Sequence, residues 1–512
     1  MRTRVRTTLA LVAVTGLVGA CDDDGADVGS ASTTDRPSAP TAPALAPTVS
    51  ATAPAPAGDT PAVTAASVEA ALGEIDGLVA AEMDHFGVPG VAEVVHLASL
   101  SKPITATAVA GLVDDGVIAW DDPVHEHNPD LTFSDDYVTE HVTFADLYSH
   151  RSGLPGLFGN TLEHIGDSRD EILSKLHLLP LDPFRSSYSY SNFGMTAAGD
   201  AAAKAAGTSF DDLVDEQLFQ PAGMTSSSTR HADFAAEANR SAIHVTDGDM
   251  WRVGPERRPD AQAPAGGVSA SLEDVTRWTR LVLNGGALDG EQIIGQDALA
   301  DTHVPHVVRG PSAGYDGPTP FYGLGWNIDE DHLGFRRWSH SGAFSAGAAT
   351  TAVLLPTEGL GVVVLTNGMP LGIPEIIADE IVDQIATGGL TDDWREVWYT
   401  DRFAHLFDAP ELEIPATPTP AAAATAYVGT YANDYFGEFE VVADGDDLTL
   451  VEHDNRYPMT HLDGDTFTIT AYPELADGSE PVTFTLGPDG TVTALDVGEA
   501  DGPGTGVLTR VP

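Results

Sequence analysis

The residues that most clearly indicate chemistry are Ser99 and Lys102, which lie three positions apart in "LASLSKPIT". The chain has three lysines, and the other two are Lys175 and Lys204. Residues three apart share a face of a helix, so the Ser99 hydroxyl and the Lys102 amine can touch. Burial lowers a lysine pKa, and the neutral amine can then accept the serine proton. The spacing therefore predicts a serine nucleophile beside its own base.

Two further motifs offer the other groups that acyl transfer needs. Tyr190 and Asn192 lie in "YSYSNFGM", where a phenol can move a proton and an amide can hold a substrate. His340 and Gly342 lie in "RRWSHSGAFSAG", at the end of an expected strand, where a glycine lets a substrate backbone approach the strand edge. Taken singly, such an aromatic and such a histidine are also ordinary components of a fold.

Hydrophobic periodicity predicts the elements that position these residues. Ser67 is expected to cap the first helix, and Pro374 and Gly388 to begin and end the last one. The expected helices cover 67–86, 99–117 and 374–388, and the expected strands cover 336–341, 348–355 and 360–366. Helices at both ends, with strands near the second end, predict a layered α+β domain.

Composition divides the chain into five parts. We expect a signal peptide, a disordered Ala/Pro/Thr tether, the α+β domain, a linker and an all-β domain, at residues 1–21, 22–65, 67–395, 396–424 and 425–512 respectively. The last part alternates short apolar runs with turns such as Asp444-Gly445, which favours a small antiparallel barrel or sandwich.

The first residues indicate export. Arg2, Arg4 and Arg6 precede an apolar run over 9–20 that is too short to span a bilayer comfortably. Cys21, the one cysteine of the chain, follows Val-Gly-Ala, which resembles the lipobox in which a cysteine is acylated. We therefore expect an exported prokaryotic lipoprotein, lipid-anchored on the outer side of the cell membrane. An ordinary secretory signal with a chance cysteine is the alternative.

Charge and histidine spacing exclude two classes of partner. The chain has 24 basic and 77 acidic residues, a formal net charge of −53, which repels phosphate backbones, so no nucleic acid is expected. His125 and His127 have no third ligand at a recognisable spacing, so no metal site is predicted.

The α/β-hydrolases are a rival class of serine enzyme, and they need the pattern Gly-x-Ser-x-Gly. The nearest stretch, "GAFSAG", has its serine one residue out of place.

The order and spacing of the three motifs resemble the serine beta-lactamase-related family, which includes class C β-lactamases, D-Ala-D-Ala carboxypeptidases and lipolytic esterases. Supporting stretches are "LYSHRSGLP", "PAGMTSSS", "APAGGVSASLEDVTRW" and "LLPTEGLGVVVLTNG". The resemblance covers about residues 67–390. It implies a penicillin-binding/β-lactamase-like transpeptidase fold, an antiparallel sheet flanked by helices plus a helical subdomain. The C-terminal part resembles the β-barrel appendage of some of these hydrolases.

The resemblance also implies catalytic roles. Ser99 matches the nucleophile, Lys102 its base, and Tyr190 the residue that activates Ser99 or protonates the leaving group. Which of Lys102 and Tyr190 takes the first proton stays open. Hydrolysis would proceed through an acyl-Ser99 intermediate and needs no cofactor.

The remaining motif residues match positions that bind the substrate. Asn192 would contact a substrate amide or carbonyl, and His340 and Gly342 would line the binding strand. The oxyanion hole would be the backbone N–H groups of Ser99 and Ala343. Relatives with Lys-Thr-Gly place a fixed positive charge where His340 stands, whereas histidine is mostly neutral at pH 7. A small-molecule or peptide ester or amide is thus the expected substrate, for an esterase or a D-Ala-D-Ala carboxypeptidase-like peptidase with poor β-lactam turnover.

One departure from the family pattern keeps a second hypothesis open. The resemblance implies a pair of strands between the first helix and Ser99, beside strand 360–366, and some forty residues of that region are missing. Without them the apolar strand 360–366 would be an exposed edge. The alternative is therefore a catalytically impaired, lipid-anchored binding or scaffolding lipoprotein that retains the pocket.

Overall fold

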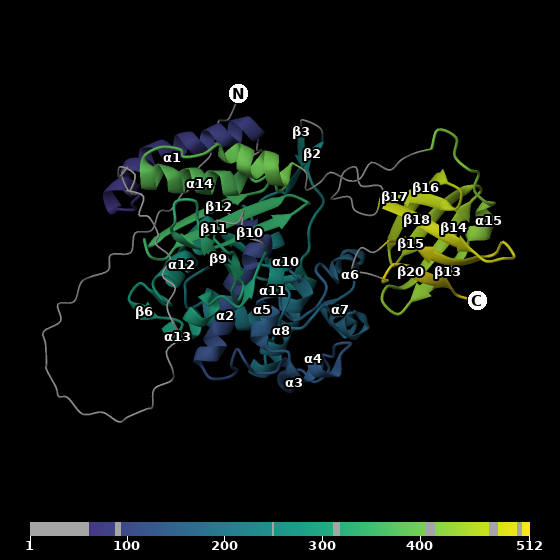
Figure 1. Ribbon diagram of the computed structural model, residues 1–512, viewed down its shortest axis with the longest axis horizontal. Helices are drawn as coiled ribbons and strands as arrows, with labels where there is room; N and C mark the ends of the chain where they lie inside the picture. The colour runs from purple at the N-terminus through teal and green to yellow at the C-terminus, as the bar shows by residue number, and fades with distance from the viewer. Residues whose placement is uncertain are drawn as a thin grey trace, which may run out of the picture.

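The computed structural model describes residues 61–87, 94–247, 250–310, 318–404, 415–470, 480–498 and 504–512. The predicted signal peptide with Cys21 and nearly all of the predicted tether lie outside these residues. Two layers of helix enclose one antiparallel sheet, and a separate barrel follows in the chain (Figure 1). This arrangement is the α+β fold with a small all-β barrel that the sequence predicted.

The outer helical layer consists of α1 (Ala65–Phe86) and α14 (Ile373–Thr387), which lie together along one face of the sheet (Figure 1). The prediction of Ser67 as the cap of α1 was wrong. Thr64 is the cap, because its hydroxyl accepts from the Ser67 N–H while the Ser67 hydroxyl accepts from the Thr64 N–H. The helix α14 ends at Gly388 in a left-handed conformation, as predicted.

The central sheet has the order β12-β11-β10-β9-β8-β7, and every neighbouring pair is antiparallel. Its strands are β7 (Val307–Val308), β8 (Phe321–Tyr322), β9 (Asn327–Glu330), β10 (Arg336–Phe344), β11 (Ala348–Leu355) and β12 (Leu360–Thr366). The strand β10 runs three residues beyond its predicted end, so that Gly342 and Ala343 belong to it. The three longest strands of this sheet lie where the sequence predicted them.

The strand β12 ends the sheet on one side, and no described strand pairs with its outer edge. Sequence reasoning expected an exposed apolar edge, yet all seven residues of β12 are buried. On one face Val362 and Val364 join the core under α1 and α14. On the other face α12 (Leu272–Leu283) places Thr279 against Gly361. Helices on both faces therefore bury this strand without the expected neighbours.

The helical subdomain covers the opposite face of the sheet and contains the main apolar core (Figure 1). Its longest helices are α2 (Ser101–Asp114) and α8 (Asn192–Ala206). The shorter ones are α3 (Val124–His127), α4 (Asp136–His141), α5 (Phe144–Tyr148), α6 (Asn160–Ile165), α7 (Arg169–Ser174), α9 (Phe210–Val214), α10 (His231–Ala236), α11 (Ala263–Gly266) and α13 (Gln296–Ala300).

Short strands connect this region. They pair as β1 (Val94–His96) with β4 (Ser269–Ser271), β2 (His244–Asp247) with β3 (Met250–Val253), and β5 (Ala287–Leu288) with β6 (Glu291–Gln292). The strand β1 is the single described strand between α1 and Ser99, and it pairs with β4 rather than with β12. The strand pair that the family resemblance implied is therefore absent from the described residues.

The predicted linker 396–424 is partly structured. Residues Glu396–Phe403 form a helical segment. It is held to α14 by the indole N–H of Trp398, which donates to Asp379 at 2.8 Å. A short helix, α15 (Ala424–Tyr427), precedes the barrel. Residues 405–414 lie outside the described part of the chain.

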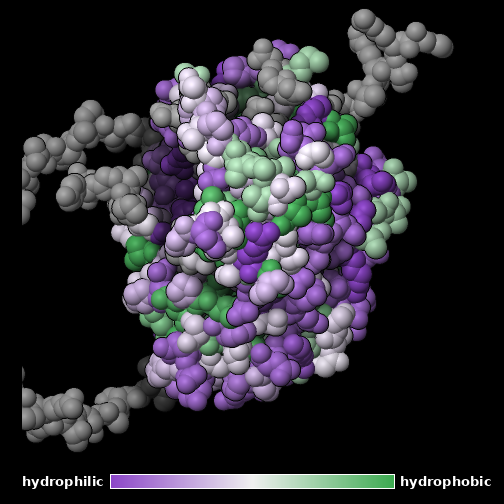
Figure 2. Space-filling model, turned by 90° about the vertical axis from the view of Figure 1, so that its right-hand side faces the viewer, coloured by the Kyte–Doolittle hydropathy of each residue, from purple (hydrophilic) through white to green (hydrophobic). Residues whose placement is uncertain are grey.

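The C-terminal part is a closed antiparallel barrel. Its strands are β13 (Gly429–Asn433), β14 (Gly437–Asp444), β15 (Asp447–Glu452), β16 (Asn455–Asp463), β17 (Thr466–Ile469), β18 (Glu480–Leu486), β19 (Val492–Asp496) and β20 (Val507–Arg510). Alternate residues such as Phe439 and Val441 fill the interior. Hydrophilic residues cover most of the molecule on the side of the barrel, with small apolar patches between them (Figure 2).

Candidate active site

Ser99 lies in a 3₁₀ turn, Ala98–Leu100, directly before α2. The single helix predicted from residue 99 is thus divided at its start. Ala98 has φ 48°, a left-handed conformation that is costly for a residue with a Cβ and that persists where surrounding structure enforces it. The turn leaves the Ser99 side chain half-buried on the wall of a cavity of about 610 Å³.

The Lys102 amine is fully buried and has three close polar neighbours. Its Nζ lies 3.0 Å from Ser99 Oγ, 2.7 Å from Asn192 Oδ1 and 2.9 Å from the Ala265 carbonyl oxygen. Burial lowers the Lys102 pKa well below its usual value. No carboxylate is among these neighbours, so the site favours the neutral amine.

Tyr190 completes the group around Ser99. Its ring centre is 4.5 Å from Lys102 Nζ, and its phenol hydrogen-bonds the Ser99 side chain. Burial raises the Tyr190 pKa above its usual value, although the bond to Ser99 opposes this shift. The fold therefore brings the hydroxyl, the amine and the phenol of Ser99, Lys102 and Tyr190 together from two distant parts of the chain.

Asn192, the first residue of α8, holds Lys102 through its side-chain oxygen. Its amide nitrogen donates to Asn160 Oδ1 at 3.2 Å, which turns the oxygen toward the amine. Both asparagines line the Ser99 cavity. Sequence reasoning found Asn192 but not Asn160, because α6 is short and offers no motif.

Gly342 and Ala343 place β10 directly beside the Ser99 turn. A Cβ on Gly342 would lie 1.9 Å from the Leu97 carbonyl oxygen and 2.9 Å from the Leu100 N. The glycine therefore admits the backbone of the Ser99 turn, and its predicted role in the approach of a substrate stays a prediction. Ala343 is exposed and lines the cavity together with Ser99.

His340 is not among the residues that line the Ser99 cavity, and its predicted contact with a substrate stays a prediction. Its buried ring has Nε2 2.9 Å from the Tyr322 hydroxyl and Nδ1 2.7 Å from the Ser341 carbonyl oxygen. Nδ1 donates to that carbonyl, so Nε2 accepts from the phenol. Burial and the nearby Lys102 lower the His340 pKa to about 3, which keeps the ring neutral. The ring instead lines a second cavity of about 360 Å³ behind Tyr190.

His150 is a neighbour that the sequence reasoning did not assign, although its stretch "LYSHRSGLP" supported the resemblance. Its Nδ1 accepts from the Ser191 N–H at 3.2 Å, and its ring centre is 4.6 Å from that of Tyr190. Burial lowers the His150 pKa well below its usual value. The neutral ring thus supports the turn that carries Tyr190 and Asn192.

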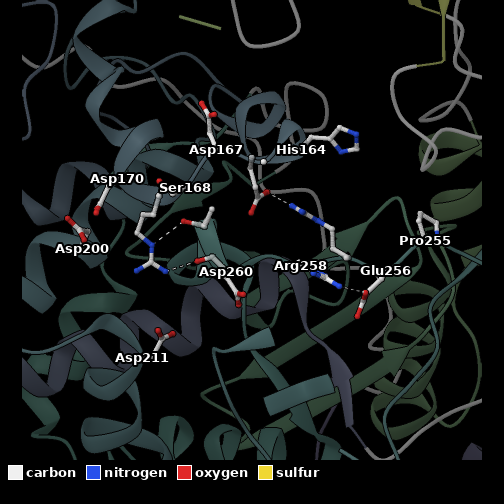
Figure 3. A pocket seen from close by; sticks show the side chains of 15 residues that line it. His164, Asp167, Ser168, Asp170, Asp200, Asp211, Pro255, Glu256, Arg258 and Asp260 are labelled. Carbon is white, nitrogen blue, oxygen red and sulfur yellow. Dashed lines mark hydrogen bonds and ion pairs between the residues drawn. The ribbon is translucent and has the colours of Figure 1, made fainter. Parts of the chain in front are cut away.

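An acidic cleft of about 750 Å³ adjoins the Ser99 cavity, and His164 and Arg257 line both. Figure 3 shows the carboxylates around it, which include Asp167, Asp170, Asp200, Asp211, Glu256 and Asp260. Arg258 pairs with Glu256 at 2.8 Å, and Arg169 donates to backbone carbonyls. The excess of carboxylates makes this side of the site unfavourable for anions.

Within the described residues, no cluster of three or more metal-ligating side chains is present. His125 and His127 lie on α3. The prediction for Cys21 concerns a residue outside the described part of the chain.

A family model described as Beta-lactamase matches residues 86–386, more than half of the chain. A second model, described as a domain of unknown function (DUF3471), matches residues 413–502, which include most of the barrel.

The sequence is similar to curated proteins over much of its length. The unguisins hydrolase ungD of Aspergillus violaceofuscus is 26% identical over 78% of this chain and 78% of its own. Penicillin-binding protein 4 of Amycolatopsis lactamdurans is 27% identical over 66% of this chain and 84% of its own. The D-alanyl-D-alanine-carboxypeptidase/endopeptidase AmpH of Escherichia coli is 24% identical over 58% and 77%.

Solved structures share the fold. The octameric penicillin-binding protein homologue from Pyrococcus abyssi has a TM-score of 0.54 at 18% identity and covers 86% of this chain and 100% of its own. The hydrolase EstCE1 has a TM-score of 0.53 at 18% identity over 63% of this chain and 100% of its own.

Proposed function

Since the chain belongs to the Beta-lactamase family of serine hydrolases, we propose that it is an exported enzyme that cleaves an ester or amide through an acyl-Ser99 intermediate. The observation that carries this proposal is the set of contacts around the Lys102 amine. A neutral amine has two N–H groups and one lone pair. The Asn192 and Ala265 oxygens can only accept, so they take both hydrogens. The lone pair is left for the Ser99 hydroxyl proton.

Lys102 is therefore the first base in our proposal. It removes the Ser99 proton as Ser99 Oγ forms a bond to the substrate carbonyl carbon. The carbonyl oxygen becomes an oxyanion between the backbone N–H groups of Ser99 and Ala343. Gly342 supports this geometry, because its missing side chain is what lets β10 approach the Ser99 turn.

Tyr190 is the proton donor in the next step. Its raised pKa keeps the phenol protonated near pH 7, so it can protonate the alcohol or amine leaving group as that bond breaks. The proton that Lys102 took from Ser99 then restores the phenol. Water attacks the acyl-Ser99 ester through the same groups in reverse, which releases the acid and the free hydroxyl.

Arg257 lines the Ser99 cavity but is paired with Glu163, and carboxylates outnumber arginines in the adjoining cleft, which favours uncharged esters and amides. His340 is neutral and lines the cavity next to that of Ser99, so it supplies no fixed positive charge for a substrate carboxylate. The acidic cleft beside the cavity disfavours anions further. We propose an esterase or a D-Ala-D-Ala carboxypeptidase-like peptidase that turns over β-lactams poorly. The relatives named as hydrolases of unguisins and of D-alanyl-D-alanine peptides agree with ester or amide chemistry.

Export and anchoring rest on the sequence. We propose that Cys21 carries a lipid that holds the protein on the outer side of the cell membrane, because the basic start, apolar run and Cys21 resemble a lipoprotein signal. In the part of the chain that the structure describes, no helix has the length and apolar character to cross a bilayer.

A fluorophosphonate probe tests the proposal, since it reacts with activated serines. We expect one adduct per chain at Ser99 and none in Ser99→Ala. No labelling of folded protein would refute the enzyme and favour the binding lipoprotein, a hypothesis supported by the absence, among the described residues, of a strand pair beside β12. Rapid hydrolysis of a chromogenic cephalosporin would refute the proposed substrate preference.

A further inference from the structure

The short helix α6 (Asn160–Ile165) lies on the side of the helical subdomain that is nearest the barrel (Figure 1). Asn160, Thr161 and His164 line the Ser99 cavity. Six residues are too few for an α-helix to persist without tertiary support. What holds α6 therefore determines the shape of this wall.

Barrel residues bond both ends of α6. The Gly159 N–H at its start donates to the Tyr435 hydroxyl at 3.1 Å. The Ile165 carbonyl at its end accepts from Asn455 Nδ2 at 3.3 Å, and His453 Nδ1 lies 3.4 Å from the same oxygen. These are backbone groups that the helix itself leaves unsatisfied. The buried apolar residues of the barrel and of the helical subdomain also form one continuous cluster.

The segment that the barrel holds is bonded to the catalytic groups. The Leu157 N–H donates to the Tyr190 carbonyl at 3.3 Å. Asn160 accepts from the Asn192 amide, and Asn192 in turn accepts from Lys102. Gly159 has φ 77°, and a Cβ there would lie 2.6 Å from the Phe193 ring, so this segment packs closely on the start of α8. A shift of α6 would free the Asn192 amide to turn its oxygen away from Lys102.

We propose that the C-terminal barrel is a positioning element of the active site, in which Tyr435 and Asn455 hold α6 at its two ends and thereby fix Asn160 and the Asn192 amide. Tyr435 is a positioning residue, because it acts through Asn160 and touches neither Ser99 nor Lys102. The expected change in the Ser99 labelling rate rests on the proposed function, whereas the contact between the barrel and α6 does not depend on catalysis.

Tyr435→Phe in the full chain tests the proposal, because it removes one hydroxyl and keeps the ring. We expect the rate constant for fluorophosphonate labelling of Ser99 to fall about tenfold, since the buried Gly159 N–H loses its partner. Tyr431→Phe is the matched control. Its hydroxyl donates to the Tyr427 carbonyl at 2.6 Å inside the barrel, so labelling should change by less than about twofold.

A double-mutant cycle distinguishes positioning from a general loss of stability. Asn160→Ala should slow labelling by itself, and adding Tyr435→Phe should slow it no further, because both changes break one connected path. The proposal would be overturned if the double variant labelled more slowly by the product of the two single effects. It would also be overturned if folded Tyr435→Phe labelled at the wild-type rate. If Tyr435→Phe does not fold, Asn455→Ala probes the other end of α6 with the same expected and contradicting results.

Amide hydrogen exchange separates this inference from the proposed function. Exchange of residues 159–166 should be about tenfold faster in Tyr435→Phe than in Tyr431→Phe whether or not the protein is an active hydrolase. Unchanged exchange would refute the contact between barrel and α6. Failure of the wild-type protein to label at Ser99, with exchange as expected, would refute the proposed function and leave a barrel that shapes a binding pocket.

Discussion

Gly342→Ala changes the distance between β10 and the turn that carries Ser99. The added methyl would lie 1.9 Å from the Leu97 carbonyl oxygen and 2.5 Å from Thr350 Oγ1. The Leu97 oxygen is part of the backbone, so no side-chain rotation relieves the first contact. The strand and the turn must therefore move apart by about 1 Å or more, a displacement that can cost an active site about 100-fold in rate.

We expect Gly342→Ala to lower the rate constant for Ser99 labelling about 100-fold and to destabilise the fold by about 1–3 kcal/mol, as overpacking of a core does. Gly77→Ala is the matched control. Gly77 lies on the exposed side of α1, and a methyl group added there would meet no atom within 4 Å. This variant should keep the wild-type labelling rate and gain about 0.5–1 kcal/mol of stability.

Labelling rates are compared with thermal unfolding of the same samples, so that loss of folded protein is not counted as loss of reactivity. A folded Gly342→Ala protein that labels at the wild-type rate would refute the close approach of β10 to the Ser99 turn. It would also remove the support for Ala343 as a donor to the oxyanion.

Three further outcomes follow from the same structure. Tyr190→Phe keeps the ring but removes the phenol that bonds Ser99, so hydrolysis of a p-nitrophenyl ester should fall about 100-fold to 10,000-fold, and wild-type turnover would contradict its role as proton donor. Burial lowers the His303 pKa in the folded protein to about 3. As the pH falls from about 6.5 toward 3, His303 is protonated in the unfolded chain but not in the folded protein, so the folded protein loses stability. His303→Phe should therefore lessen the decline in melting temperature over this range, and an equally steep decline would contradict the assignment. Cys21→Ala should abolish incorporation of a labelled fatty acid and release the protein from membranes in its host, whereas unchanged incorporation would refute the anchor.

Local patterns in the sequence predicted much of the fold. The strands β11 and β12 are buried on both faces, which produces their continuous apolar runs. The helix α1 is buried on one face, which produces its helical period of apolar residues. Both patterns are strong signals. In the barrel, β16 was not predicted, because only Met459 of its nine residues is buried and the strand includes Pro458. Its pairing with β15 is visible only in the closed barrel.

The site was predictable where chemistry follows from spacing and not where it depends on tertiary packing. Ser99 and Lys102 are three residues apart, so their proximity follows from helical geometry. The Ala265 carbonyl comes 163 residues after Lys102 and belongs to a backbone group that no motif identifies. The direction of the His340 ring likewise depends on Tyr322, a partner from another strand.

The pH dependence of Ser99 labelling by the fluorophosphonate probe tests the central claim most directly. Burial lowers the Lys102 pKa well below its usual value, so the rate should reach its plateau at a lower pH than a lysine of ordinary pKa allows, and it should fall at more acidic pH as Lys102 gains a proton. Lys102→Met should remove both the reactivity and this dependence. A wild-type rate that keeps rising to about pH 10, as for a lysine of ordinary pKa, or a Lys102→Met protein that labels normally, would contradict the account.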